Sequence, residues 1–170
     1  EVGLSYIEPL HTAEVTGMGA LRLFEAVRTH TSCSEHVRLY QASSSEQFGH
    51  QPAPQFELTP FDPRSPYAAA KVFAHHAARL YRDAYSMFIA CGIAFNHESP
   101  RRGEKFVSRI ITRGAARIKL GLQSKLKFYL PDPIPRRDWS HAKDAVRGMW
   151  MLLQYHTPME LVFGSGESHS

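Results

Sequence analysis

Two short segments carry four side chains that could together move a proton and stabilise the charge it leaves behind. Ser44 and Glu46 supply a hydroxyl and a carboxylate, and about twenty residues later Tyr67 and Lys71 supply a phenol and an ammonium. Residues four apart on a helix lie on one face, one turn from each other, so the ammonium can lie near the phenol oxygen. A neighbouring cation favours the phenolate over the phenol, whose pKa is ordinarily about 10. The pair is therefore a candidate base for removing a proton from a hydroxyl group.

The elements predicted around these residues would place them at one end of a sheet. Residues 37–42 are typical of a short strand that leads into the serine run, and the catalytic groups of open α/β sheets gather beyond the carboxyl ends of the strands. The proline-rich segment 52–66 predicts an extended loop, since proline disfavours helix at its own position and before it. The helix with the phenol and the ammonium then runs from Ser65-Pro66 to about Tyr85. The spacing alone also fits a partly buried tyrosine beside a solvated lysine.

Apolar patterns along the rest of the chain alternate between helix and strand, which indicates βα units around a parallel sheet. The strand at 88–95 would bring Asn96 and His97 to the same sheet edge as Ser44. A glycine-rich dinucleotide loop follows a strand and opens a helix, so residues 16–21 (TGMGAL), inside a predicted helix, do not form one. Helices are predicted over residues 12–29, 107–120 and 141–155, and strands over residues 88–95, 126–130 and 161–163.

The charge of the chain permits several partners. The net charge is +4 and the isoelectric point is near 9.2, as basic nucleic-acid-binding proteins can have. The arginines and lysines, however, are scattered among apolar residues, without a basic tail or a known nucleic-acid motif. The diphosphate of a sugar nucleotide would engage some of these arginines equally well, because a guanidinium holds phosphate through two hydrogen bonds. We therefore expect neither a nucleic-acid nor a membrane partner.

Cysteine and histidine positions do not suggest a metal centre. The two cysteines lack metal-ligand spacing, so Cys33 is interpreted as a loop thiol and Cys91 as a buried strand residue. His75 and His76 cannot both face one site from a helix, and we expect no bound metal. The composition, 43% hydrophobic residues without an apolar run of about 20, predicts a soluble protein. Nothing at the start resembles a signal peptide, so the cytosol is the simplest compartment.

Four motifs occur in an order and at spacings that resemble one enzyme family. They are YQASSSEQFG at 40–49, PRSPY at 63–67 followed by Lys71, FNHESPRRG at 95–103 and RDW at 137–139. Together they are similar to the GDP-mannose 4,6-dehydratases, a family of the extended short-chain dehydrogenase/reductase superfamily. The similarity runs from about Ser5 to the end, and the Asn-His-Glu-Ser-Pro run is far more selective than the Tyr/Lys pair.

This resemblance implies an α/β fold with a Rossmann-like parallel sheet and flanking helices, of which the first, cofactor-loop half is missing from the chain. Within one partial domain, residues 1–100 would form the catalytic half of the nucleotide-binding fold and residues 101–170 a substrate-binding region. The implied cofactor is NADP and the implied substrate is GDP-mannose, converted to GDP-4-keto-6-deoxymannose for GDP-fucose and related deoxyhexoses. The family commonly forms homo-oligomers; alternatively, another chain would cover the missing half.

The resemblance also implies roles for the four catalytic candidates. Tyr67 would remove the proton from the sugar 4-hydroxyl as hydride passes from C4 to NADP, and Lys71 would support the phenolate and bind the nicotinamide ribose. Ser44 would hydrogen-bond the 4-oxygen. Glu46 would remove the C5 proton and help water leave from C6. A related epimerase that only oxidises and reduces C4 does not need this carboxylate, so Glu46 discriminates between the two reactions.

Further residues are implied to bind the two ligands. Taken alone, several have simpler roles: Glu46 as a loop carboxylate, Asn96 as a strand-end cap, and Arg102 and Arg137 as surface charges. Departures from the family are His11 in place of a tyrosine, Ile110 in place of a lysine, and three prolines within residues 130–139. A catalytically inactive, truncated relative acting as a structural or interaction module is therefore the alternative function. The implied cofactor contacts are Lys71, His97, Arg102 and His11, and the implied substrate contacts are Tyr67, Asn96, Val107 and Arg137.

Overall fold

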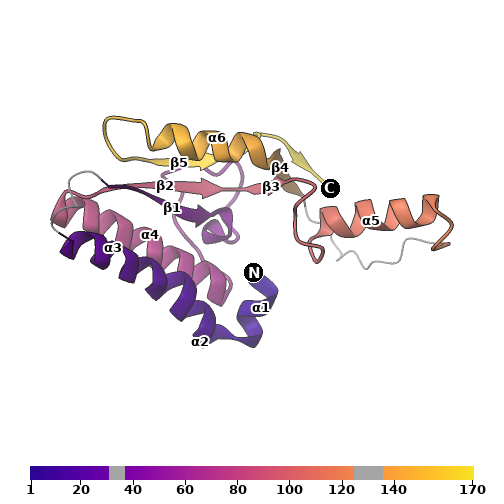
Figure 1. The fold of residues 1–170 in the computed structure, drawn as a ribbon, viewed down its shortest axis with the longest axis horizontal. Coiled ribbons are helices and arrows are strands. Elements are labelled where there is room, and N and C mark those ends of the chain that lie inside the picture. Colours follow the sequence, from indigo (N-terminus) through magenta and orange to yellow (C-terminus); the bar gives the residue numbers. More distant parts are fainter. Residues whose placement is uncertain (31–36, 125–135) are drawn as a thin grey trace. The chain divides into compact units, whose positions relative to one another are not determined.

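The computed structural model describes residues 1–30, 37–124 and 136–170 and divides the chain into two compact units (Figure 1). The first unit comprises residues 1–95 and 146–163, and the second comprises residues 96–145 and 164–170. No helix within the described ranges is both long and apolar enough to cross a membrane.

A parallel sheet of three strands forms the centre of the first unit, which confirms the predicted α/β class. Its order is β1-β2-β5, with β2 central. In the register, Ser44 lies opposite Ala94 and Cys91 lies opposite Glu160. The middle of β2 is fully buried, as expected for a parallel strand with both faces covered. The strands are β1 (Arg38–Ser44), β2 (Phe88–Ala94) and β5 (Glu160–Phe163).

Helices cover both faces of this sheet (Figure 1). On one face, Phe24 of α3 and two alanines of α4 join Ile89 and Cys91 in the largest apolar cluster. Removing such side chains from water supplies most of the folding free energy, at about 25 cal/mol per Å². On the other face, Leu152 of α6 is buried. The helices are α1 (Val2–Ile7), α2 (Pro9–Thr12), the π-helical segment η1 (Ala13–Met18), α3 (Gly19–Thr29), α4 (Pro66–Tyr85) and α6 (Ala142–Leu152).

The helix predicted over residues 12–29 is confirmed, although its first half is a π-helix. Gly17 lies in this π-helical segment, and a Cβ atom there would lie 3.2 Å from the Phe73 ring of α4. The glycine therefore allows close helix–helix packing, and the Thr-Gly-Met-Gly-Ala-Leu segment is not a dinucleotide loop.

A tight junction at Gly49 connects the end of β1 to the proline-rich loop. The short 3-10 helix η2 (Ser45–Phe48) follows β1, and its Gln47 carbonyl accepts a hydrogen bond of 2.8 Å from the Asp62 amide. Gly49 has a φ of +59°, and a Cβ atom there would lie only 1.8 Å from the Asp62 carbonyl oxygen. Only glycine allows this approach without displacing the loop that leads into α4.

Replacing Gly49 tests this junction. We expect Gly49→Ala to lower the free energy of unfolding by about 1–3 kcal/mol, because the new methyl group meets a backbone oxygen in a region of φ that alanine rarely adopts. Urea unfolding followed by circular dichroism measures the loss. Gly3→Ala is the matched control, since nothing lies within 4 Å of a Cβ atom at that position in α1. Equal stabilities of the two variants would show that the close approach of Gly49 to Asp62 does not require glycine.

The second unit has its own small sheet, which the sequence did not predict. Strand β3 is parallel to β4, and β4 is antiparallel to β6. The Asp138 carboxylate accepts hydrogen bonds from the backbone amides of Ser165 and Gly166, at 2.8 and 2.9 Å, and so holds the turn before β6. The elements are β3 (Asn96–Glu98), α5 (Val107–Lys119), β4 (Arg137–His141) and β6 (Ser168–His169).

Most predicted elements are confirmed, with further differences toward the end of the chain. The strand at 161–163 is not the last one, because β6 follows it. The helix predicted to end at Tyr155 ends at Leu152. Asn96 and His97 follow the end of β2 after one residue and form the short strand β3, which pairs with β4. The strand predicted at 126–130, Cys33 and the three prolines before Arg136 lie outside the described residues.

Candidate active site

The carboxyl end of β1 presents Ser44 and Glu46 through a helical cap. Ser44 ends the strand, and its hydroxyl accepts a hydrogen bond of 3.3 Å from the Glu46 amide. The buried Gln47 side chain returns the contact, accepting a hydrogen bond of 2.8 Å from the Ser44 amide. This reciprocal pattern is a capping box, which fixes the backbone at a helix start. The carboxylate of Glu46 has no hydrogen bond or ion pair to any residue that the structure describes, so its oxygens can accept a proton.

Tyr67 and Lys71 lie on the first two turns of α4. The Ser65 hydroxyl caps this helix by accepting a hydrogen bond from the Ala68 amide, and Pro66 occupies the first turn, where proline is tolerated. One turn separates Tyr67 from Lys71, and the Lys71 ammonium lies 5.7 Å from the centroid of the Tyr67 ring. The predicted start of the helix is confirmed, and the ammonium lies over the face of the Tyr67 ring one turn away.

Lys71 connects the helix to the strand. Its Nζ donates a hydrogen bond of 2.8 Å to the carbonyl oxygen of Ala42, two residues before Ser44. Burial lowers the pKa of the Lys71 ammonium below its ordinary value, because it removes water from the charge. A hydroxyl, a carboxylate, a phenol and a cation are thus held by one strand end and one helix start. Such a set can remove a proton from a hydroxyl and stabilise the oxygen that remains.

The other implied contacts are spread over both units. His11 is exposed on α2 of the first unit, and the second unit holds the rest. Arg102 is committed to local contacts: its Nε lies 3.4 Å from a Glu98 oxygen and its guanidinium lies 3.7 Å from the centroid of the Phe106 ring. Arg137 is exposed and donates a hydrogen bond to the Arg136 carbonyl oxygen. Asn96 and His97 are partly buried in β3, and Val107 opens α5.

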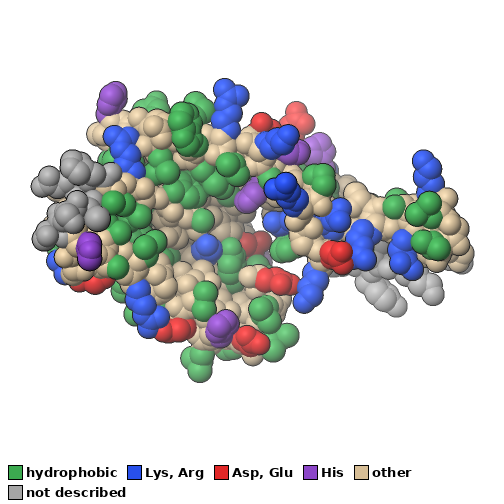
Figure 2. Space-filling model, in the orientation of Figure 1, with side chains coloured by type: hydrophobic (Ala, Val, Ile, Leu, Met, Phe, Trp, Pro, Cys, Tyr) green, Lys and Arg blue, Asp and Glu red, His purple; other side chains and the backbone are tan. Residues whose placement is uncertain are grey.

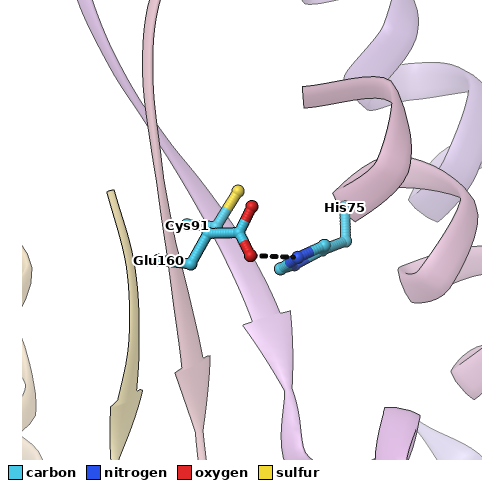
Figure 3. A group of neighbouring side chains, drawn as sticks. All are labelled: His75, Cys91 and Glu160. Atoms are coloured by element: carbon cyan, nitrogen blue, oxygen red, sulfur yellow. Dashed lines mark ion pairs between the residues drawn. The ribbon is translucent and has the colours of Figure 1, made fainter. Parts of the chain in front are cut away.

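A buried polar group behind Ser44 was missed by the sequence interpretation (Figure 3). His75 of α4 is fully buried, and its Nδ1 lies 2.7 Å from the hydroxyl oxygen of Ser43. Its Nε2 lies 3.2 Å from a carboxylate oxygen of Glu160 on β5. The available signal was the spacing, since His75 follows Lys71 by one helical turn. The neighbouring His76 is exposed, whereas His75 is buried, as expected for adjacent helical residues.

Glu160 remains ionised within this group. Burial by itself would raise the pKa of its carboxyl, but the contacts from His75 and Arg82 outweigh that effect and lower the pKa to about 2. Arg82 forms an ion pair with one carboxylate oxygen, and Arg79 lies 3.4 Å from the same oxygen. The carboxylate is therefore a permanent acceptor for His75 at neutral pH.

The pKa of Glu160 predicts a pH dependence of stability. Because the pKa is about 2 in the folded chain and 4.5 ordinarily, the unfolded chain takes up the proton first as pH falls. The stabilisation from Glu160 is therefore complete above about pH 4.5 and is lost as the pH approaches 2. Urea unfolding at several pH values should show a steeper loss for the wild type than for Glu160→Gln in this window. If the stabilities of the two proteins fell in parallel with pH, Glu160 would not be ionised in the folded chain as described.

His75, Glu160 and Cys91 are also close enough to be weighed as metal ligands. Their ligand atoms all lie within 4.8 Å of one another. Burial, however, raises the pKa of the Cys91 thiol to about 12, so the thiolate that metals require is disfavoured. The carboxylate already neutralises two arginines, whose charges would repel a cation. The charges of the two arginines and the protonated thiol disfavour a metal centre, and the His75 ring is held instead by the Ser43 hydroxyl at Nδ1 and by the nearby Glu160 carboxylate.

Figure 2 bears on the charge pattern of the first unit. On the face shown, the lysine and arginine side chains are separated by apolar and other side chains, without a continuous basic surface.

Curated relatives match the chain over almost its entire length. GDP-mannose 4,6 dehydratase 2 of Arabidopsis thaliana is 53% identical over 170 residues, which cover 99% of this chain and 45% of that protein. The human GDP-mannose 4,6 dehydratase is 48% identical over 170 residues, which cover 99% of this chain and 45% of that protein. The chain thus spans about half the length of the curated relatives it matches.

Solved structures show the same fold. RMD from Pseudomonas aeruginosa, complexed with NADPH, matches with a TM-score of 0.90 at 23% identity, over 99% of this chain and 58% of that one. DesIV, a dTDP-glucose 4,6-dehydratase from Streptomyces venezuelae, matches with a TM-score of 0.82 at 21% identity, over 99% and 50%. These likenesses confirm the Rossmann-like fold. The family model for GDP-mannose 4,6 dehydratase matches residues 1–170, and the chain therefore belongs to the GDP-mannose 4,6-dehydratase family.

Proposed function

We propose that this chain carries the catalytic side chains of an enzyme that converts GDP-mannose to GDP-4-keto-6-deoxymannose and water. The observation that carries the proposal is the junction of α4 with the end of β1, where Lys71 contacts both the Ala42 carbonyl oxygen and the Tyr67 ring. Relatives named for this reaction share about half of the residues, which supports the choice of GDP-mannose as substrate.

A nicotinamide cofactor fits the donor set at this junction. Lys71 uses one N–H for Ala42, and its remaining ammonium hydrogens are suited to the hydroxyls of a ribose. Among the similar structures, that of RMD contains NADPH and that of DesIV contains NAD. We assign NADP to this chain from its resemblance to the dehydratases. When bound, the cofactor supplies a hydride acceptor and donor, and Lys71 and His97 are the residues proposed to hold it, with Arg102 and His11 as further contacts.

Tyr67 is proposed to act on the 4-hydroxyl of the sugar. Its phenolate takes the hydroxyl proton as the C4 hydrogen leaves as hydride, so C4 becomes a ketone. The cation of Lys71 lowers the energy of the phenolate that starts this step. The Ser44 hydroxyl donates a hydrogen bond to the 4-oxygen, which gains and later loses negative charge. C4 stays a ketone in the product, so Tyr67 must give up the proton it has taken before it can act in the next turnover.

Glu46 is proposed to carry out the dehydration. A ketone at C4 makes the hydrogen on C5 acidic, and a carboxylate that no described side chain engages is a suitable base for it. The proton that Glu46 takes from C5 can then be given to the hydroxyl leaving C6, which departs as water. The C5–C6 double bond would then be reduced by the hydride returned to C6 and by a proton given to C5. Tyr67 can supply this proton after exchange with solvent, which returns it to the phenolate. The sum is loss of one water with no net oxidation.

Binding of the nucleotide is proposed for the second unit. The exposed guanidinium of Arg137 uses one N–H for the Arg136 carbonyl oxygen, and its other donors suit a diphosphate. Asn96 offers an amide for the sugar or nucleotide, and Val107 offers an apolar contact at the start of α5. Ile110, also on α5, offers no charge at the position where the family has a lysine.

The purified, mass-verified protein tests the proposal directly. We expect NADP binding by calorimetry, followed by conversion of GDP-mannose to a 4-keto-6-deoxy product detected by mass spectrometry as the loss of one water. UDP-glucose in place of GDP-mannose is the control substrate. A folded protein that neither binds NADP nor turns over GDP-mannose would sink the proposal and favour the structural or interaction module.

A further inference from the structure

Three consecutive residues at the end of β1 are each held by a different polar bond. The Ala42 carbonyl oxygen accepts from Lys71, the Ser43 hydroxyl contacts Nδ1 of His75, and the Ser44 amide donates to the Gln47 side chain. The first and third bonds belong to the candidate site itself. The second leads away from it, through the fully buried His75 ring, to Glu160 on β5.

The proton positions in this connection follow from Glu160. An ionised carboxylate only accepts hydrogen bonds, so the Nε2 atom that faces it must carry the hydrogen. In the neutral ring Nδ1 is then an acceptor, and the Ser43 hydroxyl donates to it. Arg82 fixes the position of the Glu160 carboxylate, because its guanidinium bonds both Glu160 and the carbonyl oxygen of Ile89 on β2. Ser43 and Arg82 are thus hydrogen-bonded at the two ends of the connection, while Nε2 of His75 lies beside the Glu160 carboxylate without meeting hydrogen-bond geometry to any described residue.

We propose that Ser43, His75 and Glu160 form a positioning relay that fixes the end of β1 against α4 and thereby sets the places of Ser44 and Lys71. Lys71 and His75 lie one turn apart on the same helix face, so the relay and the lysine hold two adjacent residues of the strand to two adjacent turns of the helix. A displacement of about 1 Å in reacting groups can cost about a hundredfold in rate. The catalytic consequence rests on the proposed function.

A catalytic role of the same three residues is a weaker alternative. Serine, histidine and carboxylate in this order activate the nucleophile of serine hydrolases. Here Ser43 is only 5% exposed and His75 is not exposed at all, so no substrate carbonyl can reach the hydroxyl oxygen. Burial of this kind suits a group that holds structure in place, and Ser44, the next residue, is the one at the strand end.

Two substitutions at His75 distinguish its contact with Ser43 from its contact with Glu160. His75→Gln places an amide near the former Nε2 and loses the contact to Ser43, whereas His75→Asn keeps a polar group near the former Nδ1. Ser43→Ala removes the contact from the strand side. Ile89→Val is the control, because it lowers stability at a buried position of the neighbouring strand but changes only the side chain and leaves in place the backbone carbonyl that accepts from Arg82.

Two readouts are taken on the purified protein with NADP. We expect Ser43→Ala and His75→Gln each to lower kcat about tenfold with KM for GDP-mannose unchanged, and the double variant to be no worse than either. His75→Asn should retain most of the activity, and Ile89→Val all of it. In carbon-13 lysine spectra, the pKa of Lys71 should rise toward its ordinary value in Ser43→Ala and His75→Gln, because a loosened strand end lets water reach the ammonium.

The lysine titration does not need turnover, so the two proposals can fail separately. An inactive wild type would overturn the proposed dehydratase, and the Lys71 pKa in the variants would still decide the relay. An unchanged Lys71 pKa in Ser43→Ala, or a fall of kcat in Ile89→Val equal to that in the relay variants, would overturn the relay. If His75→Gln does not fold, the milder Ser43→Ala carries the same test.

Discussion

Tyr67→Phe should abolish most of the turnover of GDP-mannose while the protein stays folded and still binds NADP. The substitution removes a single oxygen, the one proposed to take the 4-hydroxyl proton, from a helix whose cap and first turn do not depend on it. General base catalysis contributes about 10²- to 10⁴-fold, so kcat should fall within that range. The loss is measured as product formed per enzyme, with NADP binding measured in parallel.

Tyr85→Phe is the matched control for this prediction. Tyr85 is the last residue of the same helix and is half exposed. Its oxygen is remote from the Lys71 contact, so kcat should be unchanged. A Tyr67→Phe variant that keeps wild-type turnover would show that another group takes the proton and that the pair of Tyr67 and Lys71 is only a structural feature of α4.

Glu46→Gln should separate oxidation of the sugar from its dehydration. Tyr67, Lys71 and Ser44 remain, so hydride still leaves C4, but no carboxylate is available for the C5 proton. Product formation should fall about 10²- to 10⁴-fold, and absorbance of reduced nicotinamide should accumulate instead of vanishing within each turnover. In deuterated water, exchange at C5 should be lost together with dehydration.

The control for this variant is Glu14→Gln. Glu14 forms an exposed ion pair with Arg22, which is worth at most about 1 kcal/mol, so activity should be retained. Full dehydration by Glu46→Gln would assign the C5 proton to another base. It would also remove the argument that distinguishes a dehydratase from an epimerase in this chain.

The sequence predicted the first unit well because its signals are local. The apolar run from Phe88, the serine and proline at the start of α4 and the strand before Ser44 are each visible within about ten residues. Helix α5 of the second unit was also predicted from its local pattern, but the small sheet of that unit has no such signals. Strand β3 has three residues, and its Asn96 pairs with Trp139 far along the chain, so neither strand contains an apolar run that could announce it.

The residues of the candidate site also differ in whether local sequence signals identify them. Ser44, Glu46, Tyr67 and Lys71 were identified from two compact motifs, whereas the relay behind them depends on the register of the sheet. Glu160 reaches His75 because β5 pairs with β2 so that Glu160 lies opposite Cys91. Nothing near Glu160 in the sequence indicates this partner, and His75 was considered only as a metal ligand together with His76.

Deuterium transfer within the sugar is the most direct test of the central claim. GDP-mannose carrying deuterium at C4 is converted in ordinary water with NADP, and the product is examined by NMR. The proposal predicts that deuterium appears at C6 of the 4-keto-6-deoxy product and that C5 carries hydrogen from the solvent. Deuterium released into solvent, or a product with C6 still hydroxylated, would contradict a dehydratase built on Tyr67 and Glu46.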